Sequence, residues 1–298
     1  MPILAIQGTY ATLMTPFSRD AKPLGYKKQL RELFEWQIQT GVNELVVLGS
    51  TGENQCVSIQ EREQIISTVV EITRRRVPVV AGTSANSTAE TITHTLAAKT
   101  AGVDACMVMS PFYSVPSQKG LYEHFRSVAQ VGLPVMLYNN PGRAGVTILP
   151  ETVARLSAVP GIVAVKEATG NVAQATEIAA LCDITIFGGE DTLALPLMAI
   201  GATGVMSVLS NAAPARVLAM TNAFINGDYA TARKLHIDNY LLSKSLFVEA
   251  SPAPIKQTME LLGLCSASVR LPLTPCSEET TALLKRQLQV SKLLSSCA

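Results

Sequence analysis

The chain has 298 residues, of which 48% are hydrophobic and 16% are charged, and its formal net charge is +1. This length suits one large domain or a domain with an appendage. The low charged fraction leaves much apolar surface to bury in a core and in contacts between subunits. A charge so close to zero gives no electrostatic basis for binding nucleic acid or an anionic membrane.

The residues that commonly bind metals or form disulfides are scattered along the chain. No two cysteines form a C-x-x-C pair, and the three histidines lack metal-ligand spacing. These residues are Cys56, Cys106, Cys182, Cys265, Cys276, Cys297, His94, His124 and His236. We expect reduced structural thiols and neither a disulfide framework nor a zinc site.

Two uncharged stretches raise the question of targeting or membrane insertion. The first 18 residues lack a basic segment and are interrupted by Pro16, so they do not resemble a signal peptide. Thr192–Ala215 is long enough to span a bilayer, but glycines and prolines such as Pro196 and Gly204 break it into a helix, a turn and a buried strand. We therefore expect a cytoplasmic protein.

Short apolar runs rich in β-branched residues alternate with helical patterns along most of the chain. Eight runs are predicted strands: Tyr10–Met14, Glu44–Leu48, Pro78–Ala81, Ala105–Met109, Pro134–Tyr138, Ile162–Val165, Ile184–Phe187 and Gly204–Val208. Apolar spacing and the capping-box patterns at Ser58 and Ser87 predict helices between them. Further helices are expected at Gly120–Gln130, Pro150–Leu156, Val172–Leu181, Thr192–Ile200 and Pro214–Ile225.

Strict alternation of strands and helices predicts a parallel sheet covered by helices. Eight repeats favour a (β/α)₈ barrel, the TIM barrel. The alternative is a doubly wound open sheet, but Gly8-Thr9-Tyr10 does not resemble the glycine-rich turn that many such folds carry. After Gly227 only helices are expected, at Asp228–Phe247, Ala253–Leu262 and Glu278–Leu294. We therefore predict a catalytic barrel over residues 1–227 and a C-terminal helical domain over 228–298.

Candidate catalytic residues stand where the predicted strands end, as expected for a TIM barrel. The fifth strand ends at Tyr138, and an Asn-Asn-Pro-Gly turn then leads to Arg143. The sixth strand runs directly into Lys166. A phenol, a guanidinium and an amine at strand ends predict imine chemistry on a substrate that carries a carboxylate.

Lys166 is the candidate nucleophile. Two-residue alternation places it on the same face as Ala164, and burial inside the barrel would favour the neutral amine that attacks a ketone. Glu167 would then point outward, into a salt bridge or a helix contact. On spacing alone, a lysine that reaches solvent at the end of its strand is the commoner outcome, and a surface salt bridge is the corresponding alternative for Arg143.

Hydroxyl groups at other strand ends supply the remaining parts of such a site. Gly49–Glu53 could place hydroxyls and backbone N–H groups against a carboxylate, although such turns also occur without function. Tyr138 could pass protons through Ser50 to Tyr113. Each tyrosine could instead be a packed core residue with a satisfied hydroxyl.

Together these motifs resemble the dihydrodipicolinate synthase family of pyruvate-dependent class I aldolases, in the superfamily that includes N-acetylneuraminate lyase. The resemblance covers essentially the whole chain. Its most specific segments are Gly49-Ser50-Thr51-Gly52-Glu53, Pro116-Ser117-Gln118, Tyr138-Asn139-Asn140-Pro141-Gly142-Arg143-Ala144-Gly145 and Lys166-Glu167-Ala168-Thr169-Gly170.

The resemblance implies a condensation of pyruvate with L-aspartate 4-semialdehyde, the first committed step of diaminopimelate and lysine biosynthesis, with no metal or organic cofactor. By resemblance, Lys166 forms the Schiff base, and the proton relay consists of Tyr138, Ser50 and a Tyr113 supplied by the neighbouring subunit of a homotetramer. Substrate-binding roles fall by resemblance to Thr51, Arg143, Gly189 and Met206.

Two departures from the family pattern are informative. Ser50 replaces the usual threonine and keeps the hydroxyl. Asn86 and Glu90 match residues that bind the inhibitor lysine in regulated relatives, but Phe112 replaces a tyrosine there, and Ile59 and Arg62 stand where bacterial enzymes often have histidines. A lost hydroxyl donor leaves the inhibitor's carboxylate poorly paired. We therefore predict weak or absent inhibition by lysine.

Three other functions stay open on the sequence alone. A lyase that cleaves sialic acid or a related keto acid would not need Arg143. A non-catalytic barrel used for binding would be expected to lose the lysine or a hydroxyl, and all are present. A phosphate-binding barrel enzyme could use Gly188-Gly189, but Glu190 and Asp191 would repel the anion.

Overall fold

The computed structural model describes residues 7–18 and 26–295, so Cys297 lies outside the described part. Within this part, eight parallel strands close into a barrel in sequence order, and β1 pairs with β8. The strands are β1 (Gly8–Thr12), β2 (Glu44–Val47), β3 (Val79–Gly82), β4 (Ala105–Met109), β5 (Val135–Asn139), β6 (Ile162–Glu167), β7 (Thr185–Gly188) and β8 (Gly204–Ser207). The predicted barrel is confirmed, and the open-sheet alternative is wrong.

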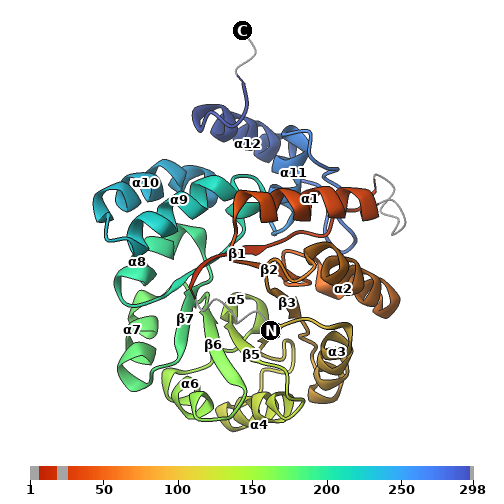
Figure 1. Cartoon of the computed structure of the whole chain (residues 1–298), viewed down its shortest axis with the longest axis vertical. Helices are drawn as coiled ribbons and strands as arrows, with labels where there is room; N and C mark the ends of the chain where they lie inside the picture. Colours follow the sequence, from red (N-terminus) through yellow and green to blue (C-terminus); the bar gives the residue numbers. More distant parts are fainter. Residues whose placement is uncertain (1–6, 19–25, 296–298) are drawn as a thin grey trace.

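Helices surround the barrel and extend it at one side (Figure 1). They are α1 (Tyr26–Thr40), α2 (Ile59–Thr73), α3 (Thr88–Ala101), α4 (Gln118–Ala129), α5 (Pro141–Ala144), α6 (Pro150–Ser157), α7 (Val172–Leu181), α8 (Ala194–Ala199), α9 (Pro214–Ile225), α10 (Tyr229–Ser245), α11 (Ala253–Leu261) and α12 (Glu278–Val290). Short 3-10 helices are η2 (Asn54–Cys56), η3 (Asp191–Leu193) and η4 (Leu209–Asn211).

Local sequence signals explain where several helices begin and end. Ser58 and Glu61 form both halves of the predicted capping box of α2. The Ser87 hydroxyl accepts a hydrogen bond from the Glu90 N–H at the start of α3. Gly102 ends α3 in the left-handed conformation that glycine favours.

Two predicted elements differ in detail. The predicted helix Thr192–Ile200 is divided into η3 and α8. Pro196 falls in the first turn of α8, where the backbone N–H groups have no helical partner, so the missing N–H of a proline is tolerated. The Asn-Asn-Pro-Gly turn contains the short helix α5. Asn140 caps this helix, Pro141 is its first residue, and Gly145 ends it at a φ of 75°.

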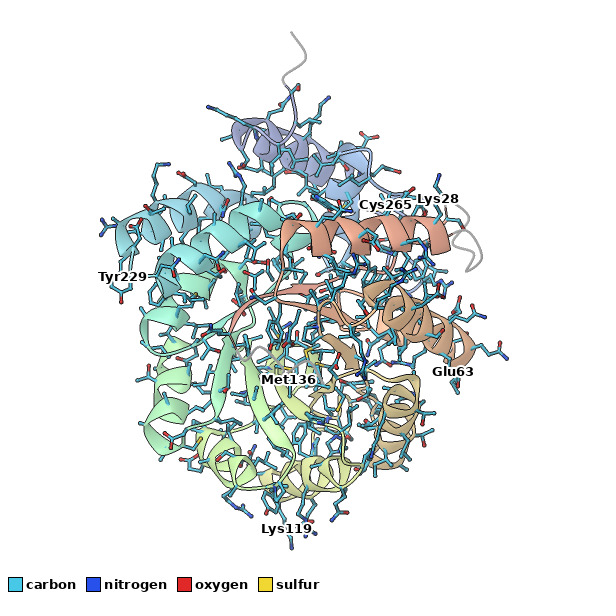
Figure 2. The ribbon with its side chains drawn as sticks, viewed as in Figure 1. Lys28, Glu63, Lys119, Met136, Tyr229 and Cys265 are labelled. Carbon is cyan, nitrogen blue, oxygen red and sulfur yellow. The ribbon has the colours of Figure 1, made fainter. Side chains whose placement is uncertain are left out.

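Two-residue alternation divides the apolar side chains between the inside and the outside of the barrel. Met136 and Tyr138 belong to the inner cluster, whereas Val135 and Leu137 pack against the helices. Figure 2 shows Met136 within the ring of strands and Lys119 at the outer rim of the molecule. The barrel interior is therefore filled by side chains, and open space is left at the ends of the strands.

The C-terminal helices share an apolar cluster with the last barrel strand. The cluster combines Val205 of β8 with Val217 of α9, Leu242 of α10, Met259 of α11 and Leu284 of α12. The predicted division into domains at 227/228 falls between α9 and α10 and stays a prediction. No helix among residues 7–18 and 26–295 is both long and apolar enough to cross a bilayer.

Candidate active site

Lys166, near the end of β6, points into the barrel. Its side chain is almost completely buried, with 3% of the residue exposed, and its Nζ atom lies 4.4 Å from the centroid of the Tyr138 ring. Glu167 points to the opposite side, as predicted, where its carboxylate accepts hydrogen bonds from the Asn139 amide and the Thr169 N–H. No ion pair to Glu167 is found in the described part of the chain. The lysine that reaches solvent is therefore excluded as an alternative.

The Tyr138 phenol lies beside this amine in a network of polar contacts. Its Oη atom accepts a hydrogen bond of 2.9 Å from the Asn140 side-chain amide, and it is also hydrogen-bonded to Ser50. Burial alone would raise the pKa of Tyr138, but the charge of Lys166 and the hydrogen bonds from Ser50 and Asn140 outweigh it, so the pKa is lowered. A phenol with a lowered pKa is suited to moving protons.

Ser50 and Thr51 lie in a tight turn after β2. The Gly52 N–H donates to the Gly49 carbonyl at 3.0 Å, and the Glu53 N–H donates to the Ser50 carbonyl at 3.1 Å. The Thr15 hydroxyl donates to the Gly52 carbonyl from the neighbouring strand end. The turn is thus fixed from two sides, with its hydroxyl residues beside Tyr138.

Arg143 lies at the end of α5, on the rim of the same space. Asn140 accepts a hydrogen bond from the Arg143 N–H, and the Arg143 guanidinium donates to the Ser251 carbonyl at 3.0 Å. The side chain is exposed and forms no ion pair with any residue that the structure describes. It therefore remains available for an anionic ligand, and its predicted alternative, a surface salt bridge, is not formed.

These elements enclose one cavity of about 600 Å³. The predicted site residues that line it are Ser50, Thr51, Tyr138, Arg143, Lys166 and Gly189. Gly189 must be glycine, because a Cβ atom there would lie 2.5 Å from the Ala168 Cβ and 2.8 Å from the Glu167 carbonyl oxygen. The volume suits a small ligand and its reaction partner.

Four other predicted residues do not line this cavity. Met206 is fully buried in the inner cluster, so the predicted direct contact with the pocket is not found. Asn86 and Glu90 are exposed at the start of α3. Tyr113 is 92% exposed on the loop after β4, at a φ of 73° that is unusual for a tyrosine.

Several residues around the cavity are not predicted from the sequence. Lys244, Phe247, Val248 and Ser251 come from the C-terminal segment, and no local pattern marks them. Asn140 stands within the predicted turn, where its cap position was the available signal. Glu190 is the acidic side chain among the lining residues. Burial and the nearby charge of Asp191 raise the pKa of Glu190, and together they outweigh the charge of Lys166, which lowers it.

Asp191 does not line the cavity but holds part of its wall in place. Its carboxylate accepts hydrogen bonds from the Ser207 hydroxyl at 2.5 Å and from the Val208 and Leu209 N–H groups. Burial raises the pKa of Asp191 despite these bonds. The contacts fix the chain after β8, where Val208 forms part of the cavity wall.

Comparisons with known proteins agree with this geometry. The sequence model of the dihydrodipicolinate synthetase family matches residues 5–291. A 4-hydroxy-tetrahydrodipicolinate synthase of Citrifermentans bemidjiense is 44% identical over 291 residues, covering 97% of this chain and 99% of the relative. The corresponding enzyme of Geobacter sulfurreducens is also 44% identical, with the same coverage.

Solved structures give the same result. The 4-hydroxy-tetrahydrodipicolinate synthase of Methylacidiphilum fumariolicum SolV superposes with a TM-score of 0.93 at 37% identity, covering 96% of both chains. A dihydrodipicolinate synthase of Cyanidioschyzon merolae with lysine bound gives a TM-score of 0.93 at 32% identity, covering 97% of this chain and 99% of its own. This chain belongs to the dihydrodipicolinate synthetase family.

Proposed function

We propose that the protein is a 4-hydroxy-tetrahydrodipicolinate synthase, which condenses pyruvate with L-aspartate 4-semialdehyde. The observation that carries the proposal is the buried Lys166 amine beside the Tyr138 ring, in a cavity that also holds Ser50, Thr51 and Arg143. Relatives that are 44% identical over nearly the whole chain carry this name.

In the first half of the reaction, the Lys166 amine attacks the keto carbon of pyruvate. The resulting carbinolamine loses water to form a Schiff base, which then loses a proton from its methyl group to become an enamine. The Ser50–Thr51 turn holds the pyruvate carboxylate with its hydroxyls and N–H groups. Tyr138 carries protons to and from the reacting atoms, and its lowered pKa supports this role.

In the second half, the enamine carbon attacks the aldehyde of the semialdehyde and forms the new carbon–carbon bond. The amino group of the bound acceptor then displaces Lys166 as the ring closes, which frees the enzyme amine. Arg143 is proposed to hold the acceptor carboxylate in a bidentate contact. Its exposed position on the cavity rim supports this role.

Tyr113 is proposed to complete the proton relay of a neighbouring subunit in a homotetramer built from two dimers. Its 92% exposure and unusual backbone conformation support a role outside its own chain. We also propose a cytoplasmic location. The described cysteines Cys56, Cys106, Cys182, Cys265 and Cys276 carry free thiols, which fits a reducing compartment.

Borohydride reduction in the presence of pyruvate, followed by peptide mass spectrometry, tests the proposal. We expect one reduced pyruvate adduct on the peptide that carries Lys166. Lys256 is a matched control, because it is also fully buried but does not line the cavity. Absence of an adduct on the folded wild-type protein, or an adduct on Lys256 alone, would refute the Schiff-base mechanism.

A further inference from the structure

A second buried lysine lies close to the active site but outside its cavity. Lys256 on α11 is fully buried, and its ammonium forms an ion pair with the Glu53 carboxylate. The same Nζ atom donates to the Ser268 carbonyl at 2.8 Å and lies 4.0 Å from the centroid of the Phe17 ring. Buried charges are rare unless they are paired, so this arrangement calls for an explanation.

Arg270 adds a second cation from the same C-terminal segment. Its backbone N–H donates to the Glu53 carboxylate at 2.9 Å, and its guanidinium forms two hydrogen bonds with Glu61 of α2. The guanidinium carbon lies 4.1 Å from the Phe17 ring centroid. Glu53 is therefore held by two residues that follow it by about two hundred positions.

Glu53 is also the last residue of the turn that carries Ser50 and Thr51. It adopts a φ of 52°, in the left-handed region that a residue with a side chain rarely occupies. Such a conformation persists only where surrounding contacts hold it. Here those contacts are the ion pair with Lys256 and the hydrogen bond from Arg270.

We infer that Glu53, Lys256 and Arg270 are positioning residues that hold the Ser50–Thr51 turn in the shape that binds the pyruvate carboxylate. Without Lys256, the Glu53 carboxylate would be a buried charge that has lost its ion-pair partner. It would be stabilised by moving toward water, and the turn would have to unwind for it to do so. The C-terminal segment thereby sets the affinity of the active site for pyruvate.

A separate contact supports this role of the C-terminal segment. The Ser251 carbonyl, which stands shortly before α11, accepts the hydrogen bond from the Arg143 guanidinium. The Ser50–Thr51 turn and Arg143, the two groups assigned to substrate carboxylates, are therefore both held by residues 251–270. The inference rests on the proposed function, since it concerns the binding of pyruvate.

The test compares Lys256→Met, Glu53→Gln and the double variant with the wild-type protein. The readouts are the pyruvate concentration that gives half-maximal borohydride trapping, together with kcat and the KM for pyruvate. We expect each single variant to raise the half-maximal concentration and the KM by about tenfold, with a smaller change in kcat. In the double variant, the fold increase in the KM for pyruvate should be smaller than the product of the fold increases in the two single variants.

Two variants separate positioning from general stability. Lys234→Met removes an exposed ion pair with Asp238 and should leave pyruvate binding unchanged. Leu284→Ala weakens the packing of α12 and should lower the melting temperature without changing the KM for pyruvate. If Leu284→Ala raises that KM as much as Lys256→Met does, the effect is general loosening and the inference is wrong.

The proposed function and the inference can fail separately. Absence of an adduct on the wild-type protein refutes the proposed function. A wild-type adduct combined with unchanged pyruvate affinity in Lys256→Met refutes the inference alone. If Lys256→Met does not fold, the double variant takes its place in the test, because it removes both charges of the ion pair and leaves neither unpaired. An unchanged KM for pyruvate in the double variant also refutes the inference.

Discussion

The Asn140 side-chain amide donates a hydrogen bond to the Tyr138 hydroxyl, and the Asn140 side-chain oxygen accepts one from the Arg143 N–H. One side chain therefore fixes both the proposed proton carrier and the helix that bears the proposed carboxylate-binding group. Asn140→Asp separates these two functions, because aspartate keeps the acceptor for Arg143 and loses the donor to Tyr138.

The first prediction concerns the pH at which Tyr138 ionises. Its pKa in the wild-type protein lies below the ordinary value of 10.0, so its phenolate forms at a lower pH than that of a free tyrosine. Asn140→Asp removes a donor to the phenolate and adds a negative charge, and both effects raise the pKa. Ultraviolet titration of tyrosinate, taken as the difference between each protein and its Tyr138→Phe counterpart, should show the midpoint move to higher pH. A midpoint that moves to lower pH would contradict this assignment.

The second prediction concerns the acceptor. Arg143→Ala should raise the KM for aspartate 4-semialdehyde or lower kcat/KM by about tenfold to hundredfold, because a charge-assisted hydrogen bond is lost. Pyruvate trapping should be nearly unchanged. Arg126→Ala is the control, since Arg126 pairs with Glu123 on the exposed face of α4. Unchanged kcat/KM for the semialdehyde in Arg143→Ala would contradict the proposed role of Arg143 in binding the acceptor carboxylate.

The third prediction concerns the origin of the relay tyrosine. Tyr113→Phe and Lys166→Ala should each have little activity when purified alone. In mixed dimers, one of the two sites would combine an intact Lys166 from one subunit with an intact Tyr113 from the other. Coexpression and purification through two different tags should therefore restore substantial activity. Mixed dimers that stay inactive would place Tyr113 outside the relay or within its own chain.

The fourth prediction concerns Gly189. The alanine methyl group of Gly189→Ala cannot fit beside Ala168 and the Glu167 carbonyl, so the backbone next to Lys166 must shift. Overpacking of this kind typically costs about 1–3 kcal/mol of folding free energy. Gly142→Ala also alters the cavity lining but meets only an ordinary contact of 3.5 Å with the Asn140 side chain. The melting temperature and kcat should both be lower in Gly189→Ala than in the wild-type protein. The melting temperature of Gly142→Ala should equal that of the wild-type protein.

The fifth prediction is that lysine inhibits the enzyme weakly or not at all. The Arg62 guanidinium is buried and donates to the Gly82 and Asn54 carbonyls, and Ile59 is 65% exposed. Neither Ile59 nor Arg62 supplies the histidine that the family resemblance leads us to expect in a lysine site, and Phe112 has no hydroxyl. Initial rates should be unaffected by lysine at micromolar concentrations, and Phe112→Tyr should increase sensitivity if the missing hydroxyl is the cause. Strong inhibition of the wild-type protein would show that Asn86 and Glu90 suffice.

The barrel and much of the site could be predicted because their signals are local. Two-residue alternation placed Lys166 inside, and strand ends located Tyr138, Ser50 and Arg143. The missed residues depend on contacts between distant parts of the chain. Nothing near Ser251 in sequence indicates that its carbonyl receives Arg143, and nothing near Lys256 indicates a partner in Glu53. The expected pocket contact of Met206 is absent because Met206 packs inside the barrel, and Val208 reaches the cavity instead.

The attachment of Glu53 to Lys256 and Arg270 has a consequence for protein synthesis. The catalytic groups lie in the first two thirds of the chain, and the barrel strands are complete at Ser207. Domains generally fold as units during synthesis, so the barrel can begin to form once its eighth strand has left the ribosome. The Ser50–Thr51 turn would nevertheless lack its contact to Lys256 until α11 has been made, and its contact to the Arg270 N–H until Arg270 has emerged. Competence to form the Schiff base should therefore arise late in translation, after the barrel itself has formed.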